Sequence, residues 1–111
     1  EELIWIRTAM IRTGLQNFTL DTGTHRYMID GFLGEGASAA AWRAHELDTT
    51  TRNTPVAIKL SPRDKLRSGC EMAKALHNMN PKRFANCFDT GHLTSFYPFG
   101  WCYYSVNELV A

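Results

Sequence analysis

Two short stretches of the sequence carry residue types that could hold a phosphate group. The stretch LGEGASAAAW places Gly34 and Gly36 two positions apart and follows them with small residues. Glycine has no Cβ, so the backbone N–H groups of such a turn can approach an anion closely. In the later stretch VAIK, strand alternation puts Ala57 and Lys59 on the same face. Together the stretches predict a phosphate site made of a glycine turn and a lysine.

Strand-forming segments must position both stretches. We expect strands over 26–33, 40–47 and 56–60, because β-branched and aromatic residues recur there between turn formers. The glycine turn joins the first two strands, and the polar segment 48–55 joins the second to the third. The three segments therefore predict an antiparallel meander.

A helix and two further strands should follow. Ser61 as N-cap, Pro62 at the first helical position and Asp64 near the N-terminus predict a helix start. Pro81 ends the helix, because a proline disfavours helical geometry in the residue before it. An apolar stripe runs between them, made of Leu66, Cys70, Ala73, Leu76 and Met79. Two further strands are expected over 83–88 and 101–110.

This order of elements resembles the N-terminal lobe of the protein kinase family. Gly34, Gly36 and Ala39 stand at the family's three glycine positions, and VAIK matches the family's lysine motif letter for letter. Lys59 would then be the phosphate-binding lysine. Glu71 resembles the helix glutamate that pairs with that lysine when the helix is swung in.

The resemblance covers residues 26–111 and implies an α+β fold with a five-stranded antiparallel sheet and one main helix. Residues 1–25 form a lead-in segment, with apolar residues at roughly helical spacing over 3–18. The resemblance implies ATP as the cofactor and Lys59 and Glu71 as the catalytic pair. Besides the glycines and the lysine, the implied ATP contacts are Leu33, Ala37, Ser38, Ala39, Ala41, Ala57, Asn107, Glu108 and Val110.

These contacts divide into three groups. Backbone donors at Ala37, Ser38 and Ala39 would hold the phosphates, and Leu33, Ala41 and Ala57 would cover the adenine. Asn107 would be the gatekeeper, and the backbone of Glu108 and Val110 would face the adenine.

The implied reaction is transfer of the γ-phosphoryl of ATP to a protein hydroxyl, serine or threonine by family frequency. The family takes its base from an H-R-D-x-x-x-x-N loop and its Mg²⁺ ligand from D-F-G, and the sequence contains neither motif. We therefore expect a fragment cut at the hinge that is inactive alone. The missing C-terminal lobe would hold the Mg²⁺ and the protein substrate.

A non-catalytic alternative follows from three departures. Ala39 replaces the third glycine, Ala41 replaces a valine, and Asn107 is polar where the family is usually apolar. These residues favour a pseudokinase or an interaction module with a degraded nucleotide pocket.

A remote alternative is an aspartic protease, because D-T-G occurs twice, with Asp21 and Asp89. Two such carboxylates would share a proton. The simpler interpretation is that both aspartates lie in ordinary turns.

Zinc binding is weaker still, and we expect no metal site within the chain. The candidate ligands lack close spacing: Cys70, His77, Cys87, His92 and Cys102.

Composition limits the partners and the compartment. Twelve basic and eleven acidic residues give a net charge of +1, so the chain has no field that would attract nucleic acid or a membrane. Three cysteines without a C-x-x-C pair favour free thiols in a reducing compartment. We therefore expect a cytoplasmic protein.

Overall fold

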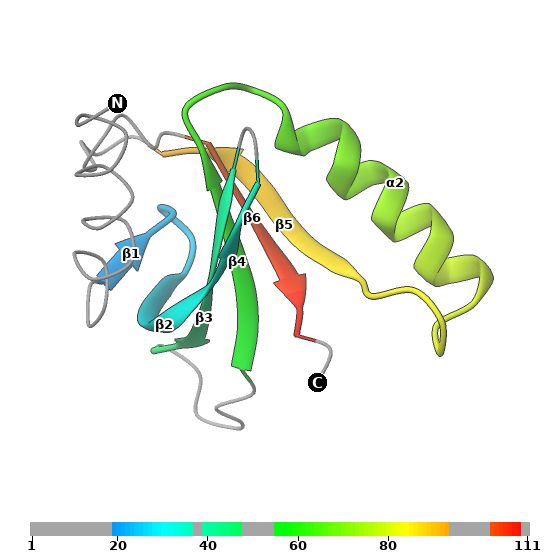
Figure 1. The fold of residues 1–111 in the computed structure, drawn as a ribbon, viewed down its shortest axis with the longest axis horizontal. Helices are drawn as coiled ribbons and strands as arrows, with labels where there is room; N and C mark the ends of the chain where they lie inside the picture. The colour runs from blue at the N-terminus through cyan, green and yellow to red at the C-terminus, as the bar shows by residue number, and fades with distance from the viewer. Residues whose placement is uncertain (1–18, 37–38, 48–54, 94–102, 110–111) are drawn as a thin grey trace.

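The computed structural model describes residues 19–36, 39–47, 55–93 and 103–109. Its strands pair antiparallel in a single sheet of order β1-β2-β3-β4-β6-β5 (Figure 1). Within this part of the chain, no helix is long and apolar enough to cross a membrane. The elements are β1 (Thr19–Asp21), β2 (Arg26–Glu35), β3 (Ala40–Glu46), β4 (Pro55–Ser61), α2 (Leu66–Met79), β5 (Cys87–His92) and β6 (Tyr103–Glu108).

The expected fold class is wrong. In place of an α+β lobe with a five-stranded sheet and a main helix, the described residues are mostly β. They form a six-stranded half-barrel with one 14-residue helix. The additional strand is β1, in which only Leu20 is buried and pairs with Tyr27 of β2. Three residues are too few for strand alternation to stand out in a sequence, so β1 was missed.

Two element boundaries also differ from expectation. Ser61 ends β4 and its Oγ accepts a hydrogen bond from the Arg63 N–H, so it closes a turn and caps no helix. The helix begins at Leu66, where Lys65 is the N-cap and provides no side-chain bond. The strand expected over 83–88 lies later, at Cys87–His92. The lead-in helix expected over 3–18 lies outside the described residues.

The apolar core lies on one face of the curved sheet. In β4, Ile58 and Leu60 are buried while Lys59 between them is exposed. Trp42 of β3 pairs with Ile58 and is also fully buried. The core cluster is Leu20, Tyr27, Ile29, Ala40, Trp42, Ala44, Val56, Ile58, Leu60, Leu93, Tyr104 and Val106. The sheet curls around this cluster. Lys59 alternates with the core residues Ile58 and Leu60, so it lies on the opposite face of the sheet.

The helix packs on the Lys59 face and is fixed there by a disulfide. Cys87 of β5 lies opposite Asn107 of β6, which shares its face with Ser105, the partner of Lys59. Cys87 is bonded to Cys70 of α2. The expectation of free thiols is therefore wrong for these two cysteines. Spacing could not reveal the pair, because the two residues lie 17 positions apart.

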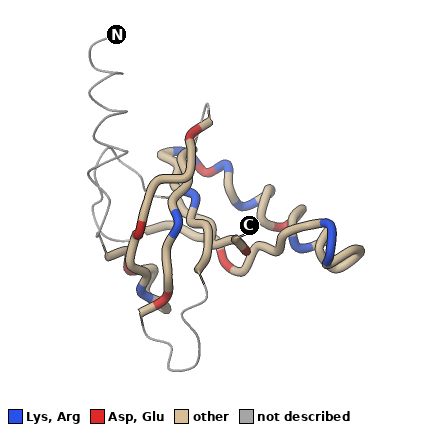
Figure 2. Tube along the Cα trace, turned by 60° about the horizontal axis from the view of Figure 1, so that its bottom comes forward, with Lys and Arg blue, Asp and Glu red and all other residues tan. Residues whose placement is uncertain are grey.

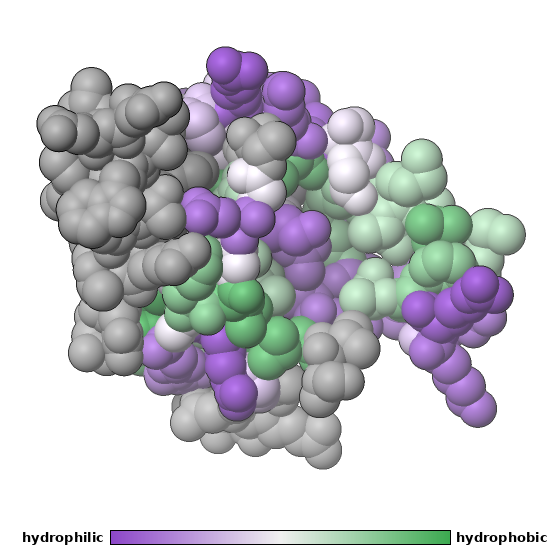
Figure 3. Space-filling model, viewed as in Figure 1, coloured by the Kyte–Doolittle hydropathy of each residue, from purple (hydrophilic) through white to green (hydrophobic). Residues whose placement is uncertain are grey.

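Hydrophobic residues are also exposed on the helix. Met72 and Met79 of α2 are 62% and 81% exposed. Figure 3 shows hydrophobic surface on the side of the molecule where Figure 1 places α2. The helix is therefore held to the sheet through a narrow stripe that includes Cys70.

Close packing at the edge of the sheet explains one glycine. A Cβ on Gly91 of β5 would lie 3.0 Å from the Tyr104 hydroxyl oxygen and 3.1 Å from its ring. The Tyr104 hydroxyl donates to Asp89 Oδ2 at 3.1 Å. Gly91 therefore allows the tyrosine side chain to lie close to the β5 backbone.

Reducing the disulfide should destabilise the fold. Closing a loop of 17 residues stabilises a protein by about 3 kcal/mol through the unfolded state. We expect the urea midpoint of the chain to fall when dithiothreitol is added. The double variant Cys70→Ser/Cys87→Ser is the control and should show the lower midpoint with or without the reductant. Equal midpoints for the oxidised and reduced wild-type chain would contradict the bond.

Alkaline pH should destabilise the fold through Tyr27. Burial, and then the charges of Glu46, Asp89 and Tyr104, raise the pKa of Tyr27 from 10.0 to about 12. The unfolded chain therefore loses this proton first, so the stabilisation is complete below pH 10 and is lost as the pH rises to 12. Tyr27→Phe should lose less unfolding free energy over this interval in urea titrations. An identical pH dependence in the two proteins would contradict the raised pKa.

Candidate functional site

A cavity of about 410 Å³ lies where the glycine turn, β4 and the start of α2 meet. This volume falls within the range of about 300–1,000 Å³ that is usual for small-molecule pockets. The two stretches that the sequence singled out are therefore brought to one cavity. The lining residues are Gly34, Glu35, Gly36, Ala39, Ala40, Ala41, Lys59 and Leu66.

Strand register aligns the main residues of the cavity. Gly34 of β2 lies opposite Ala41 of β3, and Ala41 lies opposite Lys59 of β4. Residues directly opposite in antiparallel strands share a face. The three residues therefore form a row across the sheet, with Lys59 facing the side on which the cavity opens.

Lys59 is exposed, and its side chain makes no hydrogen bond or ion pair within the described part of the chain. Basic and acidic positions are interspersed along the chain (Figure 2), so no broad surface of one sign surrounds it. The ammonium group is therefore a local positive charge that is available to an anion.

The glycines of the turn are not required by the packing of the described chain. Neither Gly34 nor Gly36 has a positive φ, in contrast to Gly23 at 91°. A Cβ on Gly34 would meet nothing within 4 Å, and one on Gly36 would meet only the Ala39 carbonyl at 3.9 Å. The backbone here borders open space, as a loop that receives a ligand would.

One donor of the turn is already used. The Gly36 N–H donates to the Ala39 carbonyl at 2.8 Å and closes the turn. The predicted donors Ala37 and Ser38 lie outside the described residues, and Ala39 lines the cavity. The described part of the turn therefore forms one wall of the cavity.

The predicted partner of Lys59 is not beside it. Glu71 is exposed on α2, does not line the cavity and forms no ion pair with Lys59 in the described chain. Its neighbour Cys70 is bonded to Cys87, which fixes this turn of the helix against β5. The helix reaches the cavity through Leu66 instead.

Leu66 is a cavity residue that sequence reasoning missed. It was assigned to the apolar stripe of the helix, because the helix start was placed at Pro62. In the structure Leu66 is the first residue of α2, so it lies at the end of the helix that meets the glycine turn. A correct helix start was the signal that could have found it.

The remaining predicted contacts lie apart from the cavity lining. Leu33 is 49% exposed in β2, and Val110 lies outside the described residues. The Asn107 amide donates to the Ala57 carbonyl at 3.3 Å and to Ser105 Oγ at 3.0 Å. Asn107 thus has the hydrogen-bond partners that a polar residue at this position needs.

Glu108 is engaged with the segment that leads into β5. Its N–H donates to the Asn86 carbonyl at 2.8 Å, and its Oε1 accepts from the Asn86 N–H at 3.0 Å. Its carboxylate also lies 3.9 Å from His77 Nδ1. Glu108 therefore anchors the end of β6.

The two D-T-G sequences occupy different settings. Asp21 Oδ1 accepts a hydrogen bond from the Gly23 N–H, so the first is the turn that was expected. Asp89 lies within strand β5, so the expectation of a turn there is wrong. The carboxylate of Asp89 accepts hydrogen bonds from the Thr90 N–H and from the Tyr104 hydroxyl.

No metal centre is formed within the described residues, where no group of three or more histidine, cysteine or acidic side chains could hold an ion. Two of the candidate zinc ligands, Cys70 and Cys87, are bonded to each other.

Comparison with known proteins found no protein-family model, no curated protein and no solved structure that matches the chain. The resemblance to protein kinases therefore stays a prediction from the residues.

Substitution by alanine should distinguish the glycines that border the cavity from a glycine that the packing of the sheet requires. Gly34→Ala and Gly36→Ala should keep the unfolding free energy within about 1 kcal/mol of wild type, since their Cβ atoms would meet open space. Gly91→Ala is the matched control and should be clearly destabilised by contact with Tyr104. Urea denaturation measures all three. A loss in Gly34→Ala as large as that in Gly91→Ala would show that Gly34 serves the fold.

Proposed function

We propose that the chain binds the phosphate groups of ATP in the cavity between the glycine turn and Lys59. The observation that carries this proposal is the row of Gly34, Ala41 and Lys59 across the sheet. The Lys59 side chain has no hydrogen-bond or ion-pair partner in the described chain and lines the cavity. On the other side of the cavity, Gly34 and Gly36 leave the backbone uncovered by side chains. A lysine acts on phosphate as a point charge, and glycine lets the ligand approach the main chain.

The apolar part of the nucleotide has suitable contacts beside this row. Ala41 and Leu66 line the cavity, and Ala57 lies two residues before Lys59 on the same face of β4. Small side chains at Ala41 and Ala57 leave room for a flat ring against the sheet. The proposed ligand therefore has its phosphates at the glycine turn and its base over these alanines.

The larger proposal is that ATP bound here donates its γ-phosphoryl to a serine or threonine hydroxyl of a protein. The base and the Mg²⁺ ligands would come from a further lobe.

A cytoplasmic location belongs to the same proposal. The Cys70–Cys87 bond removes the free-thiol argument for it, since disulfides are rare in the cytosol.

A second candidate is a nucleotide-binding or interaction module without catalysis. It is favoured by Glu71, which is exposed on α2 and not paired with Lys59 in the described chain. Under this candidate ATP binds, but a longer protein that carries the chain transfers no phosphoryl group to protein. Transfer that Lys59→Ala abolishes would exclude the second candidate.

Calorimetric titration with ATP tests the proposed site. Lys59→Ala should weaken ATP binding at least tenfold, about 1.4 kcal/mol, because it removes the one cationic side chain among the described residues that line the cavity. Lys74→Ala, at an exposed position on α2, is the control and should bind as wild type does. Adenosine should bind more weakly than ATP and should not discriminate between the variants. Absence of saturable ATP binding, or equal affinity in Lys59→Ala, would overturn the proposal.

A further inference from the structure

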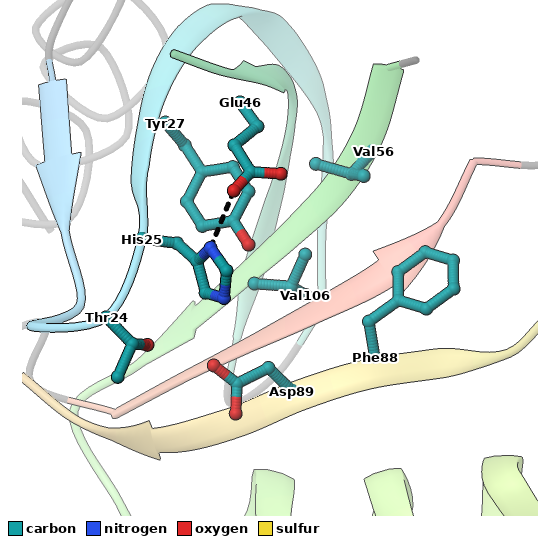
Figure 4. A pocket seen from close by; sticks show the side chains of 8 residues that line it. All are labelled: Thr24, His25, Tyr27, Glu46, Val56, Phe88, Asp89 and Val106. Carbon is teal, nitrogen blue, oxygen red and sulfur yellow. Dashed lines mark hydrogen bonds and ion pairs between the residues drawn. The ribbon is translucent and has the colours of Figure 1, made fainter. Parts of the chain in front are cut away.

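A second cavity, of about 670 Å³, lies on the opposite face of the sheet from Lys59. Val56 lines it, and alternation in β4 places Val56 and Lys59 on opposite faces. The sheet therefore separates this cavity from the proposed ATP site. Its lining residues are Thr24, His25, Tyr27, Glu46, Val56, Phe88, Asp89 and Val106 (Figure 4).

The walls of this cavity suit the apolar body of an organic ligand. Val56 and Val106 are buried core residues that reach the cavity from β4 and β6. Phe88 is 52% exposed, and its ring stands at the rim on the β5 side (Figure 4). An exposed aromatic ring beside a cavity can cover a bound ligand at little conformational cost.

The polar groups that line this cavity include two carboxylates, those of Glu46 and Asp89, together with the hydroxyl of Thr24 and the imidazole of His25. Glu46 Oε1 accepts a hydrogen bond from His25 Nδ1 at 2.6 Å. Asp89 accepts from the Thr90 N–H and from the Tyr104 hydroxyl, and its side chain points into the cavity (Figure 4). A carboxylate has about four acceptor positions, so both groups can accept further bonds. Among the described residues that line the cavity there is neither lysine nor arginine.

The Tyr27 hydroxyl is a polar group that a ligand in this cavity could reach. Tyr27 is only 5% exposed, and its hydroxyl projects into the cavity between His25 and Val106 (Figure 4). Within the described chain this hydroxyl makes no hydrogen bond. The hydroxyl is not among the fully buried polar atoms without a partner, so it meets the open space of the cavity while the rest of the residue is buried. A polar group of a ligand in the cavity can therefore hydrogen-bond to it.

The charge in the cavity indicates the sign of that ligand. Glu46 and Asp89 both act to raise the pKa of Tyr27, after the larger effect of burial. The two carboxylates repel a negative charge on the Tyr27 oxygen, and for the same reason they attract a cation placed near it. An aromatic ring adds attraction for a cation that lies over its face.

We propose that this cavity binds a small organic ammonium ion. Its nitrogen donates to the Tyr27 hydroxyl oxygen and to the carboxylates of Asp89 and Glu46. Its apolar body lies against Phe88 and Val106. The site is independent of ATP binding, because it lies on the other face of the sheet.

The test uses 2-phenylethylammonium as the probe and 2-phenylethanol as its neutral counterpart, each titrated into the chain by protein-observed NMR. We expect saturable binding of the ammonium ion, with shifts at residues lining this cavity, and at least tenfold weaker binding of the alcohol. Butylammonium should bind more weakly than the aromatic amine, because it cannot stack on Phe88.

Tyr27→Phe is the decisive variant, since it removes only a hydroxyl that has no partner in the described fold. Its urea midpoint at pH 7 should equal or exceed that of wild type, while its affinity for the probe should fall about tenfold. Tyr103→Phe, which keeps a ring outside this cavity, and Lys59→Ala should bind the probe as wild type does. No saturable binding, equal binding of the alcohol, or unchanged affinity in a folded Tyr27→Phe would overturn the proposal.

Discussion

Strand β4 has one face that packs into the core and one face that carries Lys59, and the rest of the structure depends on this alternation. Ile58 and Leu60 must face the core because they are apolar and central, and alternation then forces Lys59 to the other face. The curled sheet closes around the first set, so the charged residue of β4 is presented on the face that receives α2. Both cavities follow from this one strand, which contributes Lys59 to the first and Val56 to the second.

The disulfide is the second constraint, because it decides what the helix can offer. The disulfide fixes Cys70 of α2 against Cys87 of β5. Leu66, at the start of the helix, lines the cavity together with the glycine turn. Glu71 follows Cys70 directly, so its direction is fixed by a covalent bond next to it rather than by attraction to Lys59. A helix held in this way positions an apolar side chain at the cavity and leaves its carboxylate in solvent.

Sequence patterns predicted the long elements, and the two stretches that meet at the first cavity, better than the short or covalent features. Alternation over seven to ten residues located β2, β3 and β4, and Pro81 marked the helix end, because these signals are local. β1 was missed because three residues carry no period, and the helix start was misplaced because Ser61 bonds within a turn. The second cavity could not be foreseen, since its residues come from five separate segments that only the curvature of the sheet brings together.

The contact between Gly91 and Tyr104 has a consequence for how this sequence could diverge. The two residues are register partners, and a Cβ at position 91 would lie 3.0 to 3.2 Å from the Tyr104 side chain, so the tyrosine would have to shift. Position 91 therefore cannot change alone at low cost. In a set of descendants, we expect a larger residue at 91 to be accompanied by a smaller one at 104, so that the pair varies as a unit. The second D-T-G would then owe its glycine to a ring on the neighbouring strand, whatever its aspartate does.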